Sequence, residues 1–258
     1  MNVLNSFSLS GRVAVVTGGA GLYGRQIVRA LAEADAMTFV ASRNLQALRK
    51  LADEEKALGL NVEAFAYDQA REDSILALRD EVYARAGRVD ILVNNAVLRP
   101  MDNWDSPAEK WKESMKVNAT GLFVITRAFG DRMAEAGRGS IINIGSIYGV
   151  VGPDFWLYEE VGWRQAPDYW FLKGGMQNFT RYVAAHYGPR GVRCNVINPG
   201  GHFDNQEEGF LKRYTKRVFL GRMANDTDLK GAVVFLASDA SAYVTGATLA
   251  VDGGLTAK

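Results

Sequence analysis

Short runs of β-branched residues alternate with longer amphipathic stretches along the whole chain of 258 residues. The runs that predict strands are residues 12–16, 37–40, 62–66, 90–93, 140–144, 192–197 and 248–251. The stretches with helical spacing of apolar residues are 23–34, 45–58, 72–86, 108–134, 169–186 and 226–236. Strand and helix in alternation imply a parallel sheet with helices on both faces. We therefore predict an α/β fold, a doubly wound parallel sheet of about seven strands, in one domain spanning 1–258.

The first predicted strand runs into a glycine-rich turn at residues 17–24, with the sequence TGGAGLYG. Glycines at 19, 21 and 24 satisfy G-x-G-x-x-G, with a strand pattern before them and a helical pattern after them. Without side chains the backbone can approach a pyrophosphate, whose charge is met by the amides and dipole of the helix N-terminus. In the first βα unit this turn predicts a dinucleotide site of the Rossmann fold, although a lone match is often only a glycine-rich turn.

The end of the second predicted strand indicates which dinucleotide is bound. Ser42 and Arg43 stand where an acidic side chain would accept hydrogen bonds from the adenosine ribose and repel a 2′-phosphate. Arg43 can pair with that phosphate, so NADP(H) is preferred over NAD(H). The alternative is that Arg43 merely begins a polar helix N-terminus, where it would oppose the helix dipole.

Charge balance and residue counts argue against several other classes of function. With 30 basic and 29 acidic side chains, the sequence has no electrostatic signature of a nucleic-acid or anionic-membrane partner. His186 and His202 are too few for a histidine-based metal site, and no H-E-x-x-H or C-x-x-C spacing occurs. Cys194 is the only cysteine, so we expect a small buried hydrophobe. No stretch of ~18 apolar residues is present, so we expect a soluble, cytoplasmic protein.

Tyr169 and Lys173 carry the clearest chemical signal. Residues four apart share one face of a helix, so the Tyr hydroxyl and the Lys ammonium can address one pocket. The ammonium favours the phenolate and moves the pKa of the Tyr toward the range where it exchanges a proton with an alcohol. The pair alone is weak evidence. With Asn118 and Ser146 before it, it predicts a nicotinamide-dependent oxidoreductase acting on CH–OH groups.

In chain order these motifs resemble the short-chain dehydrogenase/reductase family over nearly the whole length. The motifs are the turn at 17–24, Asp68, Asn94-Asn95-Ala96, Asn118, Ser146, Tyr169 with Lys173, Asn198-Pro199-Gly200 and Asp252-Gly253-Gly254. The resemblance implies that Tyr169 is the general acid/base and that Lys173 lowers its pKa and binds the nicotinamide ribose. It further implies that Ser146 hydrogen-bonds the substrate oxygen and that Asn118 holds a water linking Lys173 to solvent. Taken singly, Asn118 is equally explained as a polar residue at a helix irregularity, and Ser146 as a cap.

The resemblance also implies a set of cofactor contacts and a homo-oligomer, either a tetramer or a dimer. Asp68 would meet the adenine amino group with Gln69 beside it, although Asp68 is equally explained as a helix cap. The expected cofactor-binding residues are Gly18, Gly19, Gly21, Leu22, Tyr23, Gly24, Ser42, Arg43, Asp68, Gln69, Asn95, Ala96, Tyr169, Lys173, Pro199, Gly200 and His202. The chain departs from the family at Leu22 and Val97, where glycine is usual, and at Asp204, where threonine is frequent.

The largest departure is an insertion at about 149–168, between Ser146 and Tyr169. It has no clear period and is rich in aromatic residues, so we predict a substrate-side wall; the alternative is a loop that packs on another subunit. Trp156 and Arg164 are expected substrate contacts within it, and Trp163, Glu159, Glu160 and Gln165 add further aromatic and polar groups. A lid is expected at about 201–220, with His202 as a third substrate contact.

These features together predict reversible hydride transfer between NADP(H) and a secondary alcohol or ketone. The polar insertion favours a sugar-like or polyhydroxylated substrate. The same tryptophans favour, as an alternative, a hydrophobic or aromatic ketone or a 3-oxoacyl group. A different class of function is a non-catalytic nicotinamide-binding scaffold or sensor, against which the intact set Asn118, Ser146, Tyr169 and Lys173 argues.

Overall fold

A single parallel sheet of seven strands forms the centre of the protein, in the order β3-β2-β1-β4-β5-β6-β7. The computed structural model describes residues 2–159, 161 and 165–257. The strands are β1 (Val13–Thr17), β2 (Met37–Ser42), β3 (Val62–Ala66), β4 (Ile91–Asn94), β5 (Gly139–Ile144), β6 (Val192–Pro199) and β7 (Thr248–Val251). All seven predicted strands are confirmed, and their ends shift by at most two residues. The strand order reverses between β1 and β4, the place where doubly wound sheets bind their ligands.

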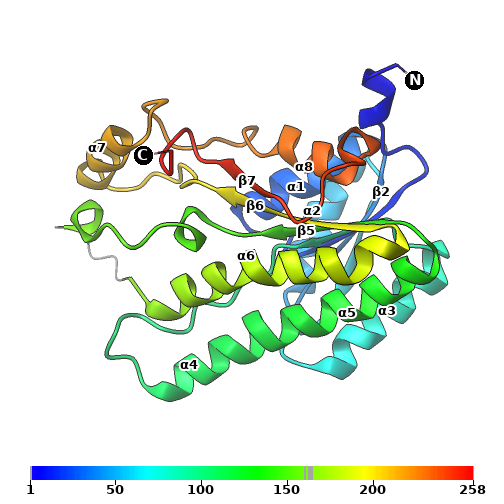
Figure 1. Cartoon of the computed structure of the whole chain (residues 1–258), viewed down its shortest axis with the longest axis horizontal. Coiled ribbons are helices and arrows are strands. Elements are labelled where there is room, and N and C mark those ends of the chain that lie inside the picture. The colour runs from blue at the N-terminus through cyan, green and yellow to red at the C-terminus, as the bar shows by residue number, and fades with distance from the viewer. Residues whose placement is uncertain (1, 160, 162–164, 258) are drawn as a thin grey trace.

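Helices cover both faces of the sheet, as predicted (Figure 1). One face carries α1 (Leu22–Glu33), α2 (Leu45–Ala57) and α8 (Lys230–Ala237). The other carries α3 (Glu72–Ala86), α4 (Ala108–Met115), α5 (Leu122–Glu135) and α6 (Pro167–Tyr187). The short 3-10 helices are η1 (Leu4–Phe7), η3 (Ile147–Gly149), η4 (Phe155–Tyr158), η5 (Gly188–Arg190) and η6 (Asp239–Ser241).

Helices α1 and α5 pack through the apolar stripes that their sequence periods predict. In α1 the stripe is Ile27, Val28 and Leu31, all fully buried against the sheet. Ile125 and Phe129 of α5 do the same on the opposite face. Burying one such side chain contributes roughly 1.5–3 kcal/mol, so two packed faces hold the strand ends that carry the site in fixed positions.

The predicted helix over 108–134 is interrupted by a π-helical turn, η2 (Lys116–Gly121). Gly121 lies so close to the β3–α3 connection that a Cβ atom there would stand 2.3 Å from the carbonyl oxygen of Gln69. Asn118 lies inside this turn and is buried. Turns of this kind concentrate at functional sites, and the sequence period did not reveal this one.

Two further differences concern the last third of the chain. The expected lid contains a regular helix, α7 (Glu208–Arg217). The helix predicted from residue 226 begins only at Lys230, because the Asn225 side chain accepts a hydrogen bond from the Thr227 amide at 2.9 Å and holds the chain in a turn.

The insertion at 149–168 packs on α7, at the same end of the molecule (Figure 1). Leu157 and Val161 are buried against Phe210 and Tyr214. Between the end of η3 at Gly149 and the start of α6 at Pro167, its only regular element among the described residues is η4, as the missing period predicted. The expected contacts Glu160, Trp163 and Arg164 lie outside the described residues. Of the helices that the structure describes, none has the length and apolar character needed to cross a membrane.

Candidate active site

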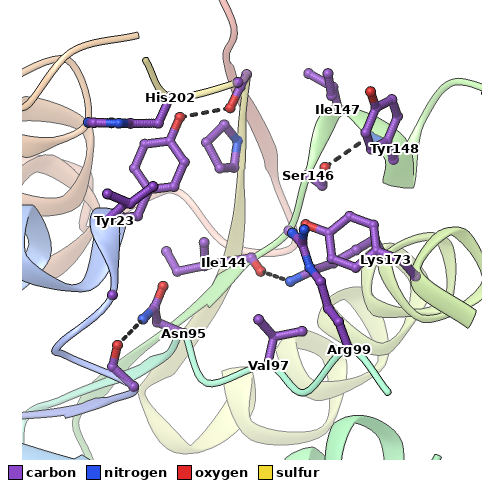
Figure 2. Close-up of a pocket in the computed structure, with 18 of the residues that line it drawn as sticks. Tyr23, Asn95, Val97, Arg99, Ile144, Ser146, Ile147, Tyr148, Lys173 and His202 are labelled. Atoms are coloured by element: carbon purple, nitrogen blue, oxygen red, sulfur yellow. Dashed lines mark hydrogen bonds between the residues drawn. The ribbon is translucent and has the colours of Figure 1, made fainter. Parts of the chain in front are cut away.

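A cavity of about 930 Å³ opens at the carboxyl edge of the sheet. Its walls are the segments that follow β1, β4, β5 and β6, together with the start of α6 and part of α7. Tyr23, Asn95 and His202 lie on one side of it, and Ser146, Arg99 and Lys173 on the other (Figure 2). The cavity therefore has two ends: we call the side of Tyr23 and Asn95 the cofactor end, and the side of Ser146, Arg99 and Lys173 the reacting end.

The turn after β1 has the geometry that a pyrophosphate needs. Gly18 has φ of +69°, and a Cβ at Gly24 would stand 2.3 Å from the Gly18 carbonyl oxygen. At Gly21 a Cβ would meet nothing closer than 3.8 Å, so the backbone here faces open space. In the part of the chain that the structure describes, no side chain caps the first amides of α1, which leaves these donors for an anion. Leu22 and Tyr23 also line the cavity.

Asn95 fastens this turn to the end of β4. Its amide nitrogen donates to the carbonyl oxygens of Thr17 at 3.1 Å and Gly18 at 2.8 Å. In return, the hydroxyl of Thr17 accepts from the amides of Asn95 and Ala96. The expected contacts Asn95 and Ala96 thus lie at the cavity, and Asn95 also shapes the phosphate turn.

The residues after β2 support the predicted adenosine 2′-phosphate site. Ser42 lines the cavity, and Arg43 is exposed. Asn44, rather than Arg43, caps α2, since its side chain accepts from the Ala47 amide at 3.0 Å. Among the described residues no acidic side chain pairs with Arg43, so its guanidinium remains available for a phosphate.

Asp68 and Gln69 lie away from the cavity lining. The Asp68 carboxylate accepts from the amide of Ala70 at 2.9 Å, and the Gln69 amide donates to the carbonyl of Val117 at 2.9 Å. Gln69 is buried and connects the end of β3 to the π-helical turn. Their adenine contacts stay predictions.

Tyr23, at the start of α1, and His202, after β6, close the cofactor end. The Tyr23 hydroxyl donates to the carbonyl of Gly200 at 2.7 Å, and the ring of His202 packs edge-to-face on Tyr23 with centroids 5.4 Å apart. Among the described residues the buried Nδ1 of His202 has no hydrogen-bond partner, whereas Nε2 lies 3.1 Å from Asp226. A buried ring nitrogen at the cavity wall suits a polar group of a bound molecule. Pro199 and Gly200 also line this wall, as expected.

Tyr169, Lys173 and Ser146 come together at the reacting end. Burial alone would raise the pKa of the Tyr169 hydroxyl, but the charges of Lys173 and Arg99 and hydrogen bonding from Ser146 and Arg99 outweigh it. The pKa of Tyr169 is therefore lowered. Burial lowers the pKa of the Lys173 ammonium. The interaction with Tyr169 raises that pKa, and the charge of Arg99 lowers it further. The Lys173 ammonium is held in place by donating to the carbonyl of Ile144 at 2.6 Å.

Asn198 positions Ser146. A Cβ at Gly145 would stand 2.0 Å from the Asn198 side-chain oxygen, which accepts from the amide of Ser146 at 3.1 Å and from Gln177 at 2.9 Å. The Ser146 hydroxyl accepts from the amide of Tyr148 at 3.2 Å, so Ser146 is also the cap that its sequence context allowed. Since the oxygen is the acceptor in that bond, the hydroxyl keeps its own proton for donation at the reacting end, to the Tyr169 oxygen or to a substrate oxygen.

Asn118 does not line the cavity with its side chain. Its amide accepts from the backbone nitrogen of Leu98 at 2.8 Å and donates to the carbonyl of the same residue at 2.7 Å. A further bond at 3.1 Å runs to Ser114, whose hydroxyl contacts Asp168 at 2.5 Å. Asn118 therefore ties the segment after β4 to the start of α6, and its link to water stays a prediction.

The structure adds residues that the sequence interpretation missed. Arg99 lies over the Tyr169 ring, with its Cζ 4.1 Å from the centroid. Tyr148 contacts Trp170 at 4.3 Å between centroids and hydrogen-bonds Tyr158 through its hydroxyl. A charged residue three positions after the Asn-Asn-Ala motif was the available signal for Arg99. Nothing local distinguished Tyr148.

Of the polar groups expected from the insertion, Gln165 lines the cavity, and Tyr158, which was not expected there, lines it too. Trp156 instead packs under Arg217, whose Cζ is 4.9 Å from its ring, and Arg217 pairs with Asp154 at 3.0 Å. The substrate contact expected at Trp156 stays a prediction. Its packing on Arg217 offers this side chain a second, structural role.

Comparisons with known proteins agree with this geometry. A family model described as enoyl-(acyl carrier protein) reductase matches residues 21–256. D-threitol dehydrogenase of Mycolicibacterium smegmatis is 36% identical over 261 aligned positions, covering 98% of this chain and 95% of that enzyme. Galactitol 2-dehydrogenase (L-tagatose-forming) of Cereibacter sphaeroides is 35% identical, with 99% of each chain covered. The crystal structure of a gluconate 5-dehydrogenase from Burkholderia cenocepacia in complex with NADP and tartrate superposes with a TM-score of 0.90, at 32% identity, over 100% of both chains.

Proposed function

Because this chain belongs to the short-chain dehydrogenase/reductase family, we propose that it transfers a hydride between NADP(H) and a secondary alcohol or ketone of a sugar-like, polyhydroxylated molecule. The observation that carries the proposal is the convergence of Ser146, Tyr169 and Lys173 at one end of the cavity, with the pKa of Tyr169 lowered. Such a set is suited to moving a proton to or from a carbinol oxygen.

The cofactor that suits this cavity is nicotinamide adenine dinucleotide phosphate, NADP(H), which supplies or accepts the hydride. The turn at Gly18 to Gly24 would hold its pyrophosphate, and Ser42 with Arg43 its 2′-phosphate. Lys173 would hold the hydroxyls of the nicotinamide ribose. The NADP in the gluconate 5-dehydrogenase complex supports this choice of cofactor.

The protein residues handle the proton and the charge on oxygen. In oxidation the Tyr169 phenolate accepts the hydroxyl proton of the substrate, and in reduction the phenol donates it. The Ser146 hydroxyl donates to the same oxygen, whose negative charge grows as the carbonyl is reduced. Asn198 holds Ser146 and the Ile144 carbonyl holds Lys173, so these donors need little rearrangement as the charge develops. They therefore stabilise the transition state more than the ground state.

A polyhydroxylated substrate is supported by polar groups that line the cavity and by the relatives. Tyr158, Gln165, His202 and Gln206 line the cavity. The similar enzymes are named for threitol, galactitol and gluconate. The test is NADP reduction over a panel of four- to six-carbon polyols, sugars and sugar acids. A chain that turns over none of them, but reduces aryl ketones, refutes the assignment.

A hydrophobic ketone remains the second assignment, because Tyr148, Trp170, Phe210 and Met223 also line the cavity. A similar enzyme named 3beta-hydroxysteroid dehydrogenase 2 is 32% identical. The same panel, extended to bulky cyclic ketones, separates the two by their kcat/KM values.

Changing Ser42 to Asp and Arg43 to Gln together is expected to shift preference from NADP toward NAD by at least ~10-fold. The change removes a charge-assisted phosphate contact, worth about 1.5–3 kcal/mol, and adds a repelling carboxylate. The ratio of kcat/KM for the two cofactors measures the shift. A parent protein that already prefers NAD contradicts the assignment of Arg43.

Gln165→Ala is expected to raise the KM for the substrate about 3- to 10-fold with an unchanged melting temperature, because the side chain lines the cavity and carries one neutral hydrogen bond. Trp156→Ala is the comparison, since this side chain packs on Arg217. A larger effect on KM at Trp156 than at Gln165 indicates that Trp156 meets the substrate after all. Dissociation of either variant into smaller species would assign the insertion to assembly.

We also propose a homo-oligomer, a dimer or tetramer. Exposed Phe123, Phe171 and Tyr182 lie on α5 and α6, neighbouring helices on one face of the molecule (Figure 1). Burying exposed aromatic side chains such as these against a second copy would favour association. Light scattering on the purified protein gives the molar mass, and a monomer at micromolar concentration refutes the proposal.

A further inference from the structure

A second cation stands beside Tyr169. Arg99 follows β4, lines the cavity, and places its guanidinium 4.1 Å above the Tyr169 ring. Its side chain and that of Lys173 reach the same part of the cavity from different elements (Figure 2). Lys173 donates to the carbonyl of Ile144, whereas Arg99 is exposed and, besides its hydrogen bond to Tyr169, has further N–H donors on its guanidinium.

Among the described residues no carboxylate pairs with the Arg99 guanidinium. The only acidic side chain of these residues that lines the cavity is Asp168. Asp168 is itself buried and accepts from the Ser114 hydroxyl at 2.5 Å. Of the described residues, the reacting end thus holds two cations, Lys173 and Arg99, and one carboxylate, that of Asp168, which is already hydrogen-bonded.

The backbone before Arg99 is held in position. Both polar atoms of the Leu98 backbone are hydrogen-bonded to the Asn118 amide, at 2.8 and 2.7 Å. Arg99 thus projects from a fixed point of the wall, and less of its ordering has to be supplied when a ligand binds. Bidentate recognition of a carboxylate is the contact for which a guanidinium is best shaped.

We propose that Arg99 binds a carboxylate of the substrate, so that the physiological substrate is a hydroxy acid or oxo acid, such as an aldonate, rather than a neutral polyol. This inference rests on the proposed function and narrows it. Because Arg99 lies against Tyr169, the carboxylate belongs within a few carbons of the reacting carbinol.

The test compares an aldonate with the polyol of the same carbon skeleton in the full-length enzyme with NADP. Wild type should prefer the aldonate in kcat/KM. Arg99→Gln should lower the aldonate-to-polyol ratio at least ~30-fold, as loss of a charge-assisted bidentate contact implies, and Arg99→Lys should restore part of it. Arg132→Gln, which removes an exposed Arg on α5 away from the cavity, should leave the ratio unchanged.

Using the ratio separates carboxylate binding from tuning of Tyr169, since altered proton transfer affects both substrates alike. Equal losses on both overturn the carboxylate site and leave Arg99 as a group that only tunes Tyr169. A wild type that oxidises polyols but not aldonates also overturns it, while the proposed function stands. If the wild type oxidises neither substrate, the proposed function fails. Calorimetry of the NADP complex with the aldonate then still tests the carboxylate site. Aldonate binding that Arg99→Gln abolishes upholds the site, and a lack of aldonate binding to the wild type refutes it.

Discussion

Tyr169→Phe is expected to lower kcat by at least ~10²-fold with little change in the Kd for NADP, because the substitution removes only the hydroxyl that exchanges the proton. The hydroxyl lies at the reacting end of the cavity, and the ring keeps its packing against Tyr148 and Trp170. Steady-state kinetics and a fluorescence titration of NADP measure the two quantities.

The pH profile of the parent enzyme provides a second measure of Tyr169. Oxidation needs the phenolate, so kcat/KM for the alcohol should fall as the pH drops through the pKa of Tyr169. Since this pKa is lowered from 10, the fall should lie below that value. Ser146→Ala is the comparison: it should reduce the rate and keep a pH-dependent fall, but move that fall to higher pH, because it removes one of the hydrogen bonds that lower the pKa of Tyr169. A Tyr169→Phe protein with near-parental kcat removes Tyr169 from the mechanism.

Lys173→Met is expected to lower kcat by at least ~10²-fold and to weaken NADP binding by at least ~10-fold. The ammonium lowers the pKa of Tyr169 by its charge, and it is the group proposed to hold the ribose hydroxyls. Without it the pKa of Tyr169 rises, so the acidic limb of the oxidation profile should move to higher pH. Met fills the same buried volume, which limits the loss of stability to about 1–3 kcal/mol for the unpaired Ile144 carbonyl.

Melting temperatures of the Met variant and the parent separate this effect from unfolding. Lys173→Arg is the comparison that keeps the charge, and it should retain more of the NADP affinity than Met does. Loss of turnover with unaltered NADP affinity would contradict the ribose contact. An unmoved pH profile would contradict the electrostatic role.

The sequence by itself determined the sheet, its seven strands and the two covered faces. The reason is that burial on both faces imposes β-branched runs, and one-sided burial imposes a helical period, so both patterns are local. The same locality explains why the turn at Gly18 to Gly24 and the pair Tyr169 and Lys173 could be recognised. Parallel strands end at one edge, which brings residues after β1, β4, β5 and β6 into one cavity.

Only the tertiary structure decided the contacts between segments that no period relates. Arg99 stands over Tyr169 because Asn118 in the π-helical turn holds Leu98, and this turn exists where Gly121 meets Gln69. The insertion directs Tyr158 rather than Trp156 into the cavity because Leu157 and Val161 are buried against α7. Such choices depend on which side chains fill a given space, and packing of distant segments leaves no spacing in the sequence from which to predict it.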